Sequence, residues 1–249
     1  MARINSVGTF DNSFDSDGSV IIDVSGNDNF VDLAVRSDGN IAIAGSAIGD
    51  PTVVVVTPTG ALYTAFNDDG VSRSTGLGFI TVNALSIQAD GKLVFAGRET
   101  DGLVNSHLVG RLTANGNLDP TFNGDGLNII EVGTPVYQGT LHEIVVQPDG
   151  KSAAIGSFFD PSSPSYTRTI LFRLTSSGTL DTTLNSSTTP GYVASGLSGG
   201  DDEGYAIAVN STGQLFTGLT SWTGSGRCVG ISRYNTTLAP TTWTDESLS

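Results

Sequence analysis

The chain has 249 residues, of which 32 are glycine and only 14% are charged, and its formal net charge at pH 7 is −14. A negative field of this size repels phosphate groups, so we expect neither a nucleic-acid partner nor an anionic membrane surface. Cys228 is the only cysteine, which excludes an intrachain disulfide. No apolar run reaches the roughly 20 residues that span a bilayer, so we expect no membrane insertion.

The N-terminal residues match the end of a repeat unit. The stretch MARINSVGTF lacks the apolar core of a secretion signal, so we expect a chain without a signal peptide. Residues 2–5 match the end of a third strand in the units that follow. Residues 19–24 are predicted to form a fourth strand that has no sheet of its own before it.

The clearest repeat unit lies in the middle of the chain. Two short apolar runs flank Asp90-Gly91, and an Asp-Gly pair supplies the positive φ that a tight hairpin needs. A third apolar run precedes a turn at Asn115-Gly116, and a fourth follows the next turn. The four runs are residues 85–87, 92–95, 107–112 and 128–132. One unit is therefore predicted to be a four-stranded antiparallel meander.

The hairpin marker recurs along the chain at intervals of 52, 59 and 63 residues. Its copies are Asp38-Gly39, Asp90-Gly91, Asp149-Gly150 and Thr212-Gly213. A long period with one meander per unit indicates a repeat architecture, in which each unit buries its apolar faces against its neighbours.

Four stretches carry a resemblance to a known family. QADGKLVFAG, QPDGKSAAIG, GRLTANGNLDPTFNGDG and FRLTSSGTLDTTL are similar to the bacterial delta-60 repeat. That repeat is found in β-propellers of large surface or secreted proteins. The resemblance implies a propeller fold and supplies almost no chemistry.

We predict a single all-β domain over residues 1–249, a small β-propeller with four blades of four-stranded antiparallel meanders. The blades are assigned to residues 30–81, 82–140, 141–204 and 205–249, after an N-terminal segment at residues 1–29. The last unit lacks an evident fourth strand, so we predict that the strand at residues 19–24 completes it and closes the ring. The alternatives are an open arc of four blades, and two chains that together make one larger ring.

An arginine followed eight positions later by an aspartate recurs in three copies of the unit. The first complete unit has Val55 and Tyr63 at these positions, so both charges are lost together. Because an isolated buried charge is expensive and a paired one is tolerated, joint loss favours a structural ion pair over a repeated ligand site. The predicted structural pairs are Arg3 with Asp11, Arg111 with Asp119, and Arg173 with Asp181.

Candidate ligand-binding residues lie where the first strand of each unit begins. In a closed propeller this strand lines the axis, so these side chains are predicted to ring one mouth of a channel. An aromatic loop residue of the last unit could also stack on a sugar. The candidates are Asp32, Asn83, His142, Glu143, Tyr205 and Trp222. The alternative is an ordinary polar rim without a ligand.

We predict no metal site, no cofactor and no catalytic residue. The acidic turn at residues 15–18 resembles only the start of a calcium loop, and His107 and His142 lack a partner at metal-binding spacing. The acidic run at residues 201–203 is expected to be solvated. The sequence contains no nucleophile elbow and no phosphate-binding glycine loop. A pair of carboxylates for glycoside hydrolysis stays an open alternative, because such a pair is defined by distance in the folded structure and not by spacing in the sequence.

The sequence therefore favours a non-enzymatic β-propeller that serves as a structural or adhesive interaction module. We expect it outside the cell, on a bacterial surface or on a virion, with variable loops that face a protein or glycan surface. One alternative is a lectin-like or glycan-processing propeller. Another is a purely architectural subunit that forms a homo-oligomer or assembles into a larger particle.

Overall fold

A computed structural model gives the fold, and the residues that it describes are 1–102, 104–131, 138–159, 167–185, 189–195, 201–222 and 226–234. Fifteen β-strands make up their regular structure, which confirms the all-β prediction. No helix in this part of the chain is long and apolar enough to cross a membrane.

The strands form four antiparallel sheets, and the strands of each sheet follow one another in chain order. The first sheet contains β1 (Asp28–Val35), β2 (Ile41–Ala47), β3 (Asp50–Val56) and β4 (Val71–Arg73). The second contains β5 (Phe79–Ile87), β6 (Leu93–Thr100), β7 (Asn105–Leu112) and β8 (Leu127–Ile130). The third contains β9 (Gln138–Val146), β10 (Ser152–Phe159), β11 (Thr167–Leu174) and β12 (Tyr192–Ser195). The fourth has three described strands, β13 (Asp202–Val209), β14 (Leu215–Trp222) and β15 (Arg227–Tyr234).

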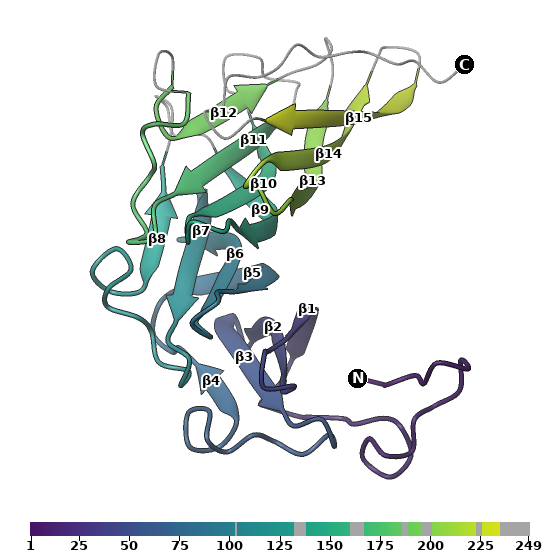
Figure 1. Cartoon of the computed structure of the whole chain (residues 1–249). Helices are drawn as coiled ribbons and strands as arrows, with labels where there is room; N and C mark the ends of the chain where they lie inside the picture. The colour runs from purple at the N-terminus through teal and green to yellow at the C-terminus, as the bar shows by residue number, and fades with distance from the viewer. Residues whose placement is uncertain are drawn as a thin grey trace.

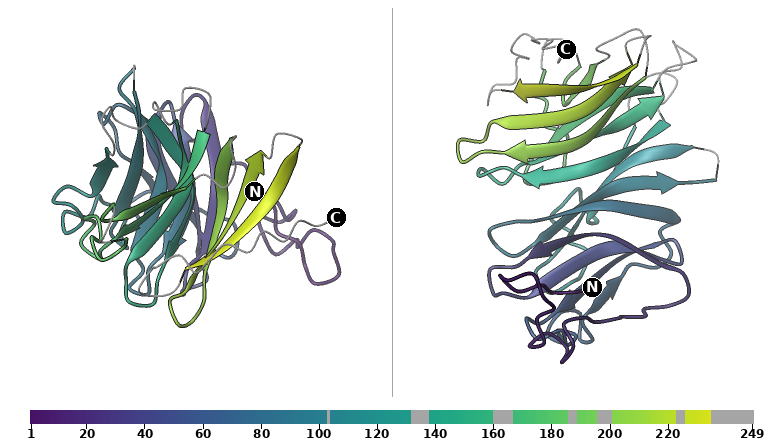
Figure 2. Two further views of the ribbon diagram at one scale, coloured as in Figure 1. Left: turned by 90° about the horizontal axis from the view of Figure 1, so that it is seen from above. Right: turned by 90° about the vertical axis from the view of Figure 1, so that its right-hand side faces the viewer.

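The four sheets are stacked face to face along a curve (Figure 1 and Figure 2). The first strand of a sheet lies on the concave side of this arc, and the fourth strand lies on the convex side (Figure 1). The first and last sheets form the two ends, and the sheets described do not close into a ring. Meander blades in an arc are the arrangement of a β-propeller.

Apolar side chains between successive sheets hold the arc together. One cluster joins the first sheet to the second, where Ala42 and Ala44 face Leu93 and Phe95. Two further clusters join the second sheet to the third and the third to the fourth. Because alternate side chains of a strand point to opposite faces, a sheet inside the arc is buried on both faces. This explains why β10 is apolar or small at nearly every position.

Each first strand carries one extra residue opposite the second strand of its sheet. These β-bulges fall at Val31, Asn83, His142 and Tyr205. In the first three sheets the bulge lies opposite a glycine, and a methyl group on Gly97 would overlap the carbonyl oxygen of Thr81. The glycine that ends QADGKLVFAG therefore permits the close backbone approach that the bulge requires.

A large apolar residue from each outer turn is inserted beneath the turn of the next sheet. Phe122 lies against Gly178, where an added methyl group would overlap the phenyl ring, and Phe66 lies against Gly116, where the methyl group would be only 3.0 Å from the ring. Both phenylalanines are fully buried. Glycine at these turns thus serves two needs, a positive φ and room for the ring of the preceding blade.

The same turn-to-turn contact holds the N-terminal segment on the first sheet. The backbone amide of Asp15 donates to the carbonyl of Thr59 over 2.9 Å, as the amide of Asn67 donates to the carbonyl of Asn115 one sheet further on. Phe14 is fully buried in a cluster with residues of the first sheet. The segment therefore lies where the outer turn of a preceding blade would lie.

The described residues do not show the predicted closure of the ring by residues 19–24. Val20, Ile22 and Val24 pack on the first sheet, and no residue of the segment is hydrogen-bonded to the described strands of the last sheet. Ile21 is 95% exposed, and Ile231 of the last sheet is 75% exposed. The physical reason is the turn contact just described, which fixes the segment at the end of the arc opposite to β15 (Figure 1).

We expect Gly97→Ala to lower the free energy of unfolding by about 2–3 kcal/mol, because the methyl group forces the bulged strand away. Gly218→Ala is the matched control, since its methyl group would lie 3.6 Å from the Cβ of Ala206, an ordinary contact. Urea denaturation of both variants measures the difference. Equal stabilities would show that the bulge does not need the glycine.

His107 is a buried histidine in the joint between the second and third sheets. Its side chain has no exposed surface, its Nε2 lies 3.2 Å from the carbonyl oxygen of Ser157, and its ring meets that of Phe172 edge to face at 5.1 Å. Burial disfavours the charged imidazolium and lowers the pKa of His107 to about 4, against hydrogen bonds that raise it.

This pKa predicts acid sensitivity in a defined range. The folded pKa lies below the unfolded value, so the stability from neutral His107 is fully present above about pH 6.5 and is lost as the pH falls toward 4. We expect this one group to account for a loss of about 3 kcal/mol between pH 7 and pH 4. Urea denaturation across this range should show a smaller loss for His107→Gln. An identical pH dependence in both proteins would contradict the assignment.

Candidate functional site

The predicted Arg–Asp pairs lie at strand ends on the turn side of the sheets. Arg111 Nε is 2.8 Å from Asp119 Oδ2, and both side chains are buried. The Arg111 guanidinium also donates to the carbonyl of Ser176 on the next sheet (2.6 Å) and lies 4.8 Å from the centre of the Phe122 ring. It therefore joins a strand end, an outer turn and the neighbouring blade, which is a structural role.

The other two predicted pairs have the same geometry with different burial. Arg173 Nε is 2.7 Å from Asp181 Oδ2, and both side chains are buried. Arg3 Nε is 2.9 Å from Asp11 Oδ2, but these side chains are 31% and 29% exposed. The exposed pair belongs to the N-terminal segment, which has no inner strands to cover it.

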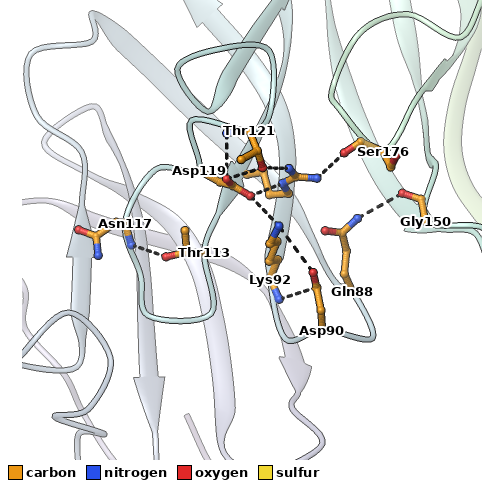
Figure 3. Close-up of polar contacts among 10 residues, drawn as sticks. Gln88, Asp90, Lys92, Thr113, Asn117, Asp119, Thr121, Gly150 and Ser176 are labelled. Atoms are coloured by element: carbon orange, nitrogen blue, oxygen red, sulfur yellow. Dashed lines mark hydrogen bonds and ion pairs between the residues drawn. The ribbon is translucent and has the colours of Figure 1, made fainter.

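A lysine that was not predicted from the sequence contacts the aspartate of each buried Arg–Asp pair. Lys92 Nζ lies 3.1 Å from Asp119 Oδ2, and Lys151 Nζ lies 3.1 Å from Asp181 Oδ2 (Figure 3 shows Lys92 with Asp119). The signal was in the sequence: lysine follows the Asp-Gly marker in the two complete units that carry the pair, and Asn40 follows it where the pair is missing.

The contacts around Asp119 keep it ionised. Burial alone would raise its pKa, but hydrogen bonds from Thr121 and Lys92 and the charge of Arg111 outweigh it and lower the pKa to about 2. The pKa of Asp181 is lowered to about 2 by the equivalent contacts. The stability that the ionised Asp119 and Asp181 contribute is present above the unfolded pKa near 4 and is lost as the pH falls toward 2.

A groove of about 790 Å³ lies between the turns of the second and third sheets. Its charged side chains are paired with one another, Lys92 with Asp90 and Arg111 with Asp119 (Figure 3 shows Lys92 between Asp90 and Asp119). Gln88 spans the groove and donates to the carbonyl of Gly150 over 3.2 Å. Because these polar groups contact one another or the neighbouring blade, the groove offers a ligand few free hydrogen-bonding partners.

The acidic turns bind their own backbone. Asp17 accepts a hydrogen bond from the amide of Ser19 at 2.7 Å, and Asp69 accepts one from the amide of Val71 at 2.7 Å. The described residues hold no group of three His, Cys, Asp or Glu side chains placed to bind a metal ion. These carboxylates stabilise turns, as Asx motifs commonly do.

The four bulge residues lie at one level on the concave side of the arc, and we call them the inner rim: Val31, Asn83, His142 and Tyr205. A bulge changes the direction of one side chain, and here it does so once per blade. The position is the same in every sheet, while the residue differs in each.

Side chains at and beside the rim contact the next sheet along the arc. Asp32 accepts a hydrogen bond from the amide of Leu85 at 2.7 Å. Asn83 donates to the carbonyl of Leu141 at 2.8 Å. These two predicted ligand residues therefore join blades, and their polar atoms are at least partly used within the fold.

His142 and Tyr205 bring two aromatic rings from neighbouring sheets together at the inner rim. Their ring centres are 5.1 Å apart and the planes are tilted by 38°, and Tyr205 is 45% exposed. The Tyr205 hydroxyl donates to Glu203, and His142 Nε2 lies 3.3 Å from Ser157 Oγ. Glu203 was expected to be solvated, and the structure brings it to the site.

The electrostatics of this rim favour a neutral histidine beside carboxylates. Burial lowers the pKa of His142, and the charge of Glu203 opposes this shift. Burial raises the pKa of Glu143, and the nearby charge of Asp32 raises it further. The rim thus combines two aromatic rings with hydrogen-bond acceptors.

One expectation about the last sheet was wrong. Asp202 is completely buried rather than solvated, because alternation along β13 turns it toward the third sheet. Trp222, predicted as a loop residue that could stack on a sugar, lies at the end of β14 on the same face as Phe216 and is 43% exposed. Asp201 uses its carboxylate to accept from the amide of Thr167 at 2.7 Å.

The fold and its repeated contacts define the class of protein, an all-β repeat protein built from propeller blades. Two segments, residues 88–122 and 147–184, match a family model described as a domain of unknown function (DUF5122) beta-propeller. Each segment runs from the glutamine of a hairpin turn to the apolar residue of the outer turn and includes one buried Lys–Arg–Asp cluster. No curated protein matches the chain.

A double-mutant cycle tests the buried pair. Arg111→Met leaves Asp119 with an incomplete set of partners, so we expect a loss of about 3 kcal/mol in the free energy of unfolding. Adding Asp119→Leu should recover part of that loss, because Lys92 still has Asp90. Arg3→Met is the exposed control and should cost less than about 1 kcal/mol. A double variant no more stable than the single variant would argue against a coupled pair.

Proposed function

We propose that this chain is a non-enzymatic interaction module of the delta-60 repeat type that acts on a bacterial surface or a virion. The observation that carries the proposal is the β-bulge at one position of every blade. A scaffold that repeats its glycines, turns and ion pairs presents a different side chain at each bulge. A repeated position that varies in this way suits recognition better than folding.

The acidic composition supports an extracellular partner that is neutral or basic. A net charge of −14 opposes nucleic acid and anionic lipid, which leaves a protein or glycan surface as the partner. The buried Arg111 and Arg173 and the partly exposed Lys92 and Lys151 are engaged in ion pairs, so they do not offset this field at a binding surface.

Glycan binding is the second candidate, and the pairing of His142 with Tyr205 favours it. Sugars present apolar ring faces to aromatic side chains and hydroxyl donors to carboxylates. Tyr205 supplies an exposed ring, Glu203 supplies an acceptor in contact with its hydroxyl, and Glu143 follows His142 in the chain. This candidate also leaves room for glycan processing by paired carboxylates.

A glycan array followed by NMR titration tests the site. Binding should weaken at least tenfold in Tyr205→Ala and in His142→Ala, because each removes half of the aromatic pair. Ile129→Ala is the control, since Ile129 is 47% exposed on the outer strand β8, away from the inner rim. A glycan or protein ligand whose affinity is unchanged in both rim variants would place the binding surface elsewhere.

A further inference from the structure

The last sheet exposes a face that every internal joint buries. On the second sheet, the face toward the third sheet includes Val94 and Val109, both without exposed surface. The strand registers place Phe216 and Ile231 at the corresponding positions of the last sheet. Phe216 is 36% exposed, Ile231 is 75% exposed, and Val229 beside them is 76% exposed. This set, with Trp222, is the tail face.

The first sheet exposes the opposite face, which we call the head face. Leu33 and Val35 on β1 are 53% and 66% exposed, whereas Leu85, the equivalent of Leu33 on the second sheet, is 5% exposed. The head face also has a small apolar hollow of about 100 Å³. The hollow is lined by Met1, Val20, Ile22, Phe30, Ile43 and Val54.

The N-terminal segment supplies the outer part of a blade on the head face. Arg3 donates to the carbonyl of Pro58 in the turn of the first sheet, as Arg111 donates to the carbonyl of Ser176 in the turn of the third. Residues 19–24 follow in the position of a fourth strand. The described residues place no inner strands beside the N-terminal segment, whereas the last sheet has three described strands and no described fourth strand. The two parts are complementary.

We infer that the tail face of one copy docks on the head face of a second copy, and that residues 19–24 of the second copy supply the fourth strand beside β15. The joint needed is the one already formed three times within the chain. A second copy can be added with this geometry unchanged. Closure within one chain would instead require all three internal joints to bend further, because the two faces lie at opposite ends of the arc (Figure 1).

Such a contact joins two different surfaces, so it is heterologous and must close into a ring or continue as a filament. Two copies with four blades each make an eight-bladed ring, which lies within the range of known propellers. Among the described strands, β15 has a neighbour on one side only, and the contact supplies a strand for its other side. The inference does not depend on the inner rim.

One overlap must be resolved for the contact to form. Arg3 and Arg233 occupy the same position of the repeat, so residues 2–4 and 232–234 cannot both fill the end of the third strand. β15 is paired with β14 along all eight of its residues, whereas Ala2 and Ile4 form only isolated bridges. Residues 2–4 are therefore the part that moves aside, so the bond of Arg3 to Pro58 is lost in the assembly, while the contact of Asp15 with Thr59 is kept.

Disulfide trapping tests the register. The pairing of β7 with β8, continued by one residue, places Cys228 of one copy opposite Asp23 of the other. Cys228 is exposed and is the only cysteine, so Asp23→Cys creates a single pair at a distance that a disulfide can span. Oxidised glutathione serves as the oxidant, and peptide mass mapping identifies the cross-link. Asp68→Cys, in an exposed turn of the first sheet, is the matched control.

The result expected is a cross-link between position 23 and Cys228 that joins two chains and doubles the mass on a non-reducing gel. The control variant should give no cross-link at this register. The same bond within one chain would show that the ring closes alone and would overturn the inference. Absence of any bond between these positions would overturn it as well.

Two face variants test the association without a cross-link. Sedimentation velocity of the full chain should show a concentration-dependent dimer or larger assembly, which Ile231→Asp on the tail face and Val35→Asp on the head face should each weaken at least tenfold. A mixture of the two variants should regain one joint and form a 1:1 complex, because each retains the face that the other lacks. A monomeric wild-type chain, or a mixture that does not associate, would refute head-to-tail docking.

Discussion

The structure depends on one constraint: a four-stranded meander has two apolar faces, and neither face can be left in water without cost. Each sheet in the middle of the arc satisfies this by packing against a neighbour on both sides. Alternating side chains along one strand serve two different joints, so Val94 faces the third sheet while Leu93 and Phe95 face the first. The arc is therefore a chain of equivalent joints, and only its two ends lack a neighbour.

Close packing of the joints dictates where polar groups can go. Inside the joints, a charge is tolerated only with its partners, as in the clusters of Lys92, Arg111 and Asp119. Backbone and side-chain hydrogen bonds then cross from one blade to the next, from Asn83 to Leu141 and from Arg111 to Ser176. These bonds fix the relative position of neighbouring blades, which apolar contact alone would leave free to slide.

The inner rim shows how a repeated scaffold accommodates variation. The bulge is a feature of the backbone, so it is compatible with valine, asparagine, histidine or tyrosine at the bulged position. Function can change at the rim without disturbing the joints. His142 and Tyr205 come from different blades, yet they stack because equivalent positions in adjacent blades are neighbours in space.

Local sequence determined the units of this protein. The Asp-Gly markers determined the hairpins, the alternation of apolar residues determined the strands, and the joint loss of Arg and Asp in one unit identified the ion pairs. These features are local or repeat with a fixed period, so a single chain reveals them. Lys92 and Lys151 could have been identified in the same way, because each directly follows an Asp-Gly marker in a unit that carries the ion pair.

Only the tertiary structure decided how the units are joined at the ends. Residues 19–24 have the sequence pattern of a fourth strand. This pattern is compatible with packing on the first sheet or with pairing to the last sheet. The turn contact of Asp15 with Thr59 places them on the first sheet. Likewise, neither the bulge that directs Tyr205 toward His142 nor the burial of Asp202 has a sequence signature. Both features arise at the interface between two sheets. The contacts across this interface depend on how the sheets pack, and the local sequence does not encode that packing.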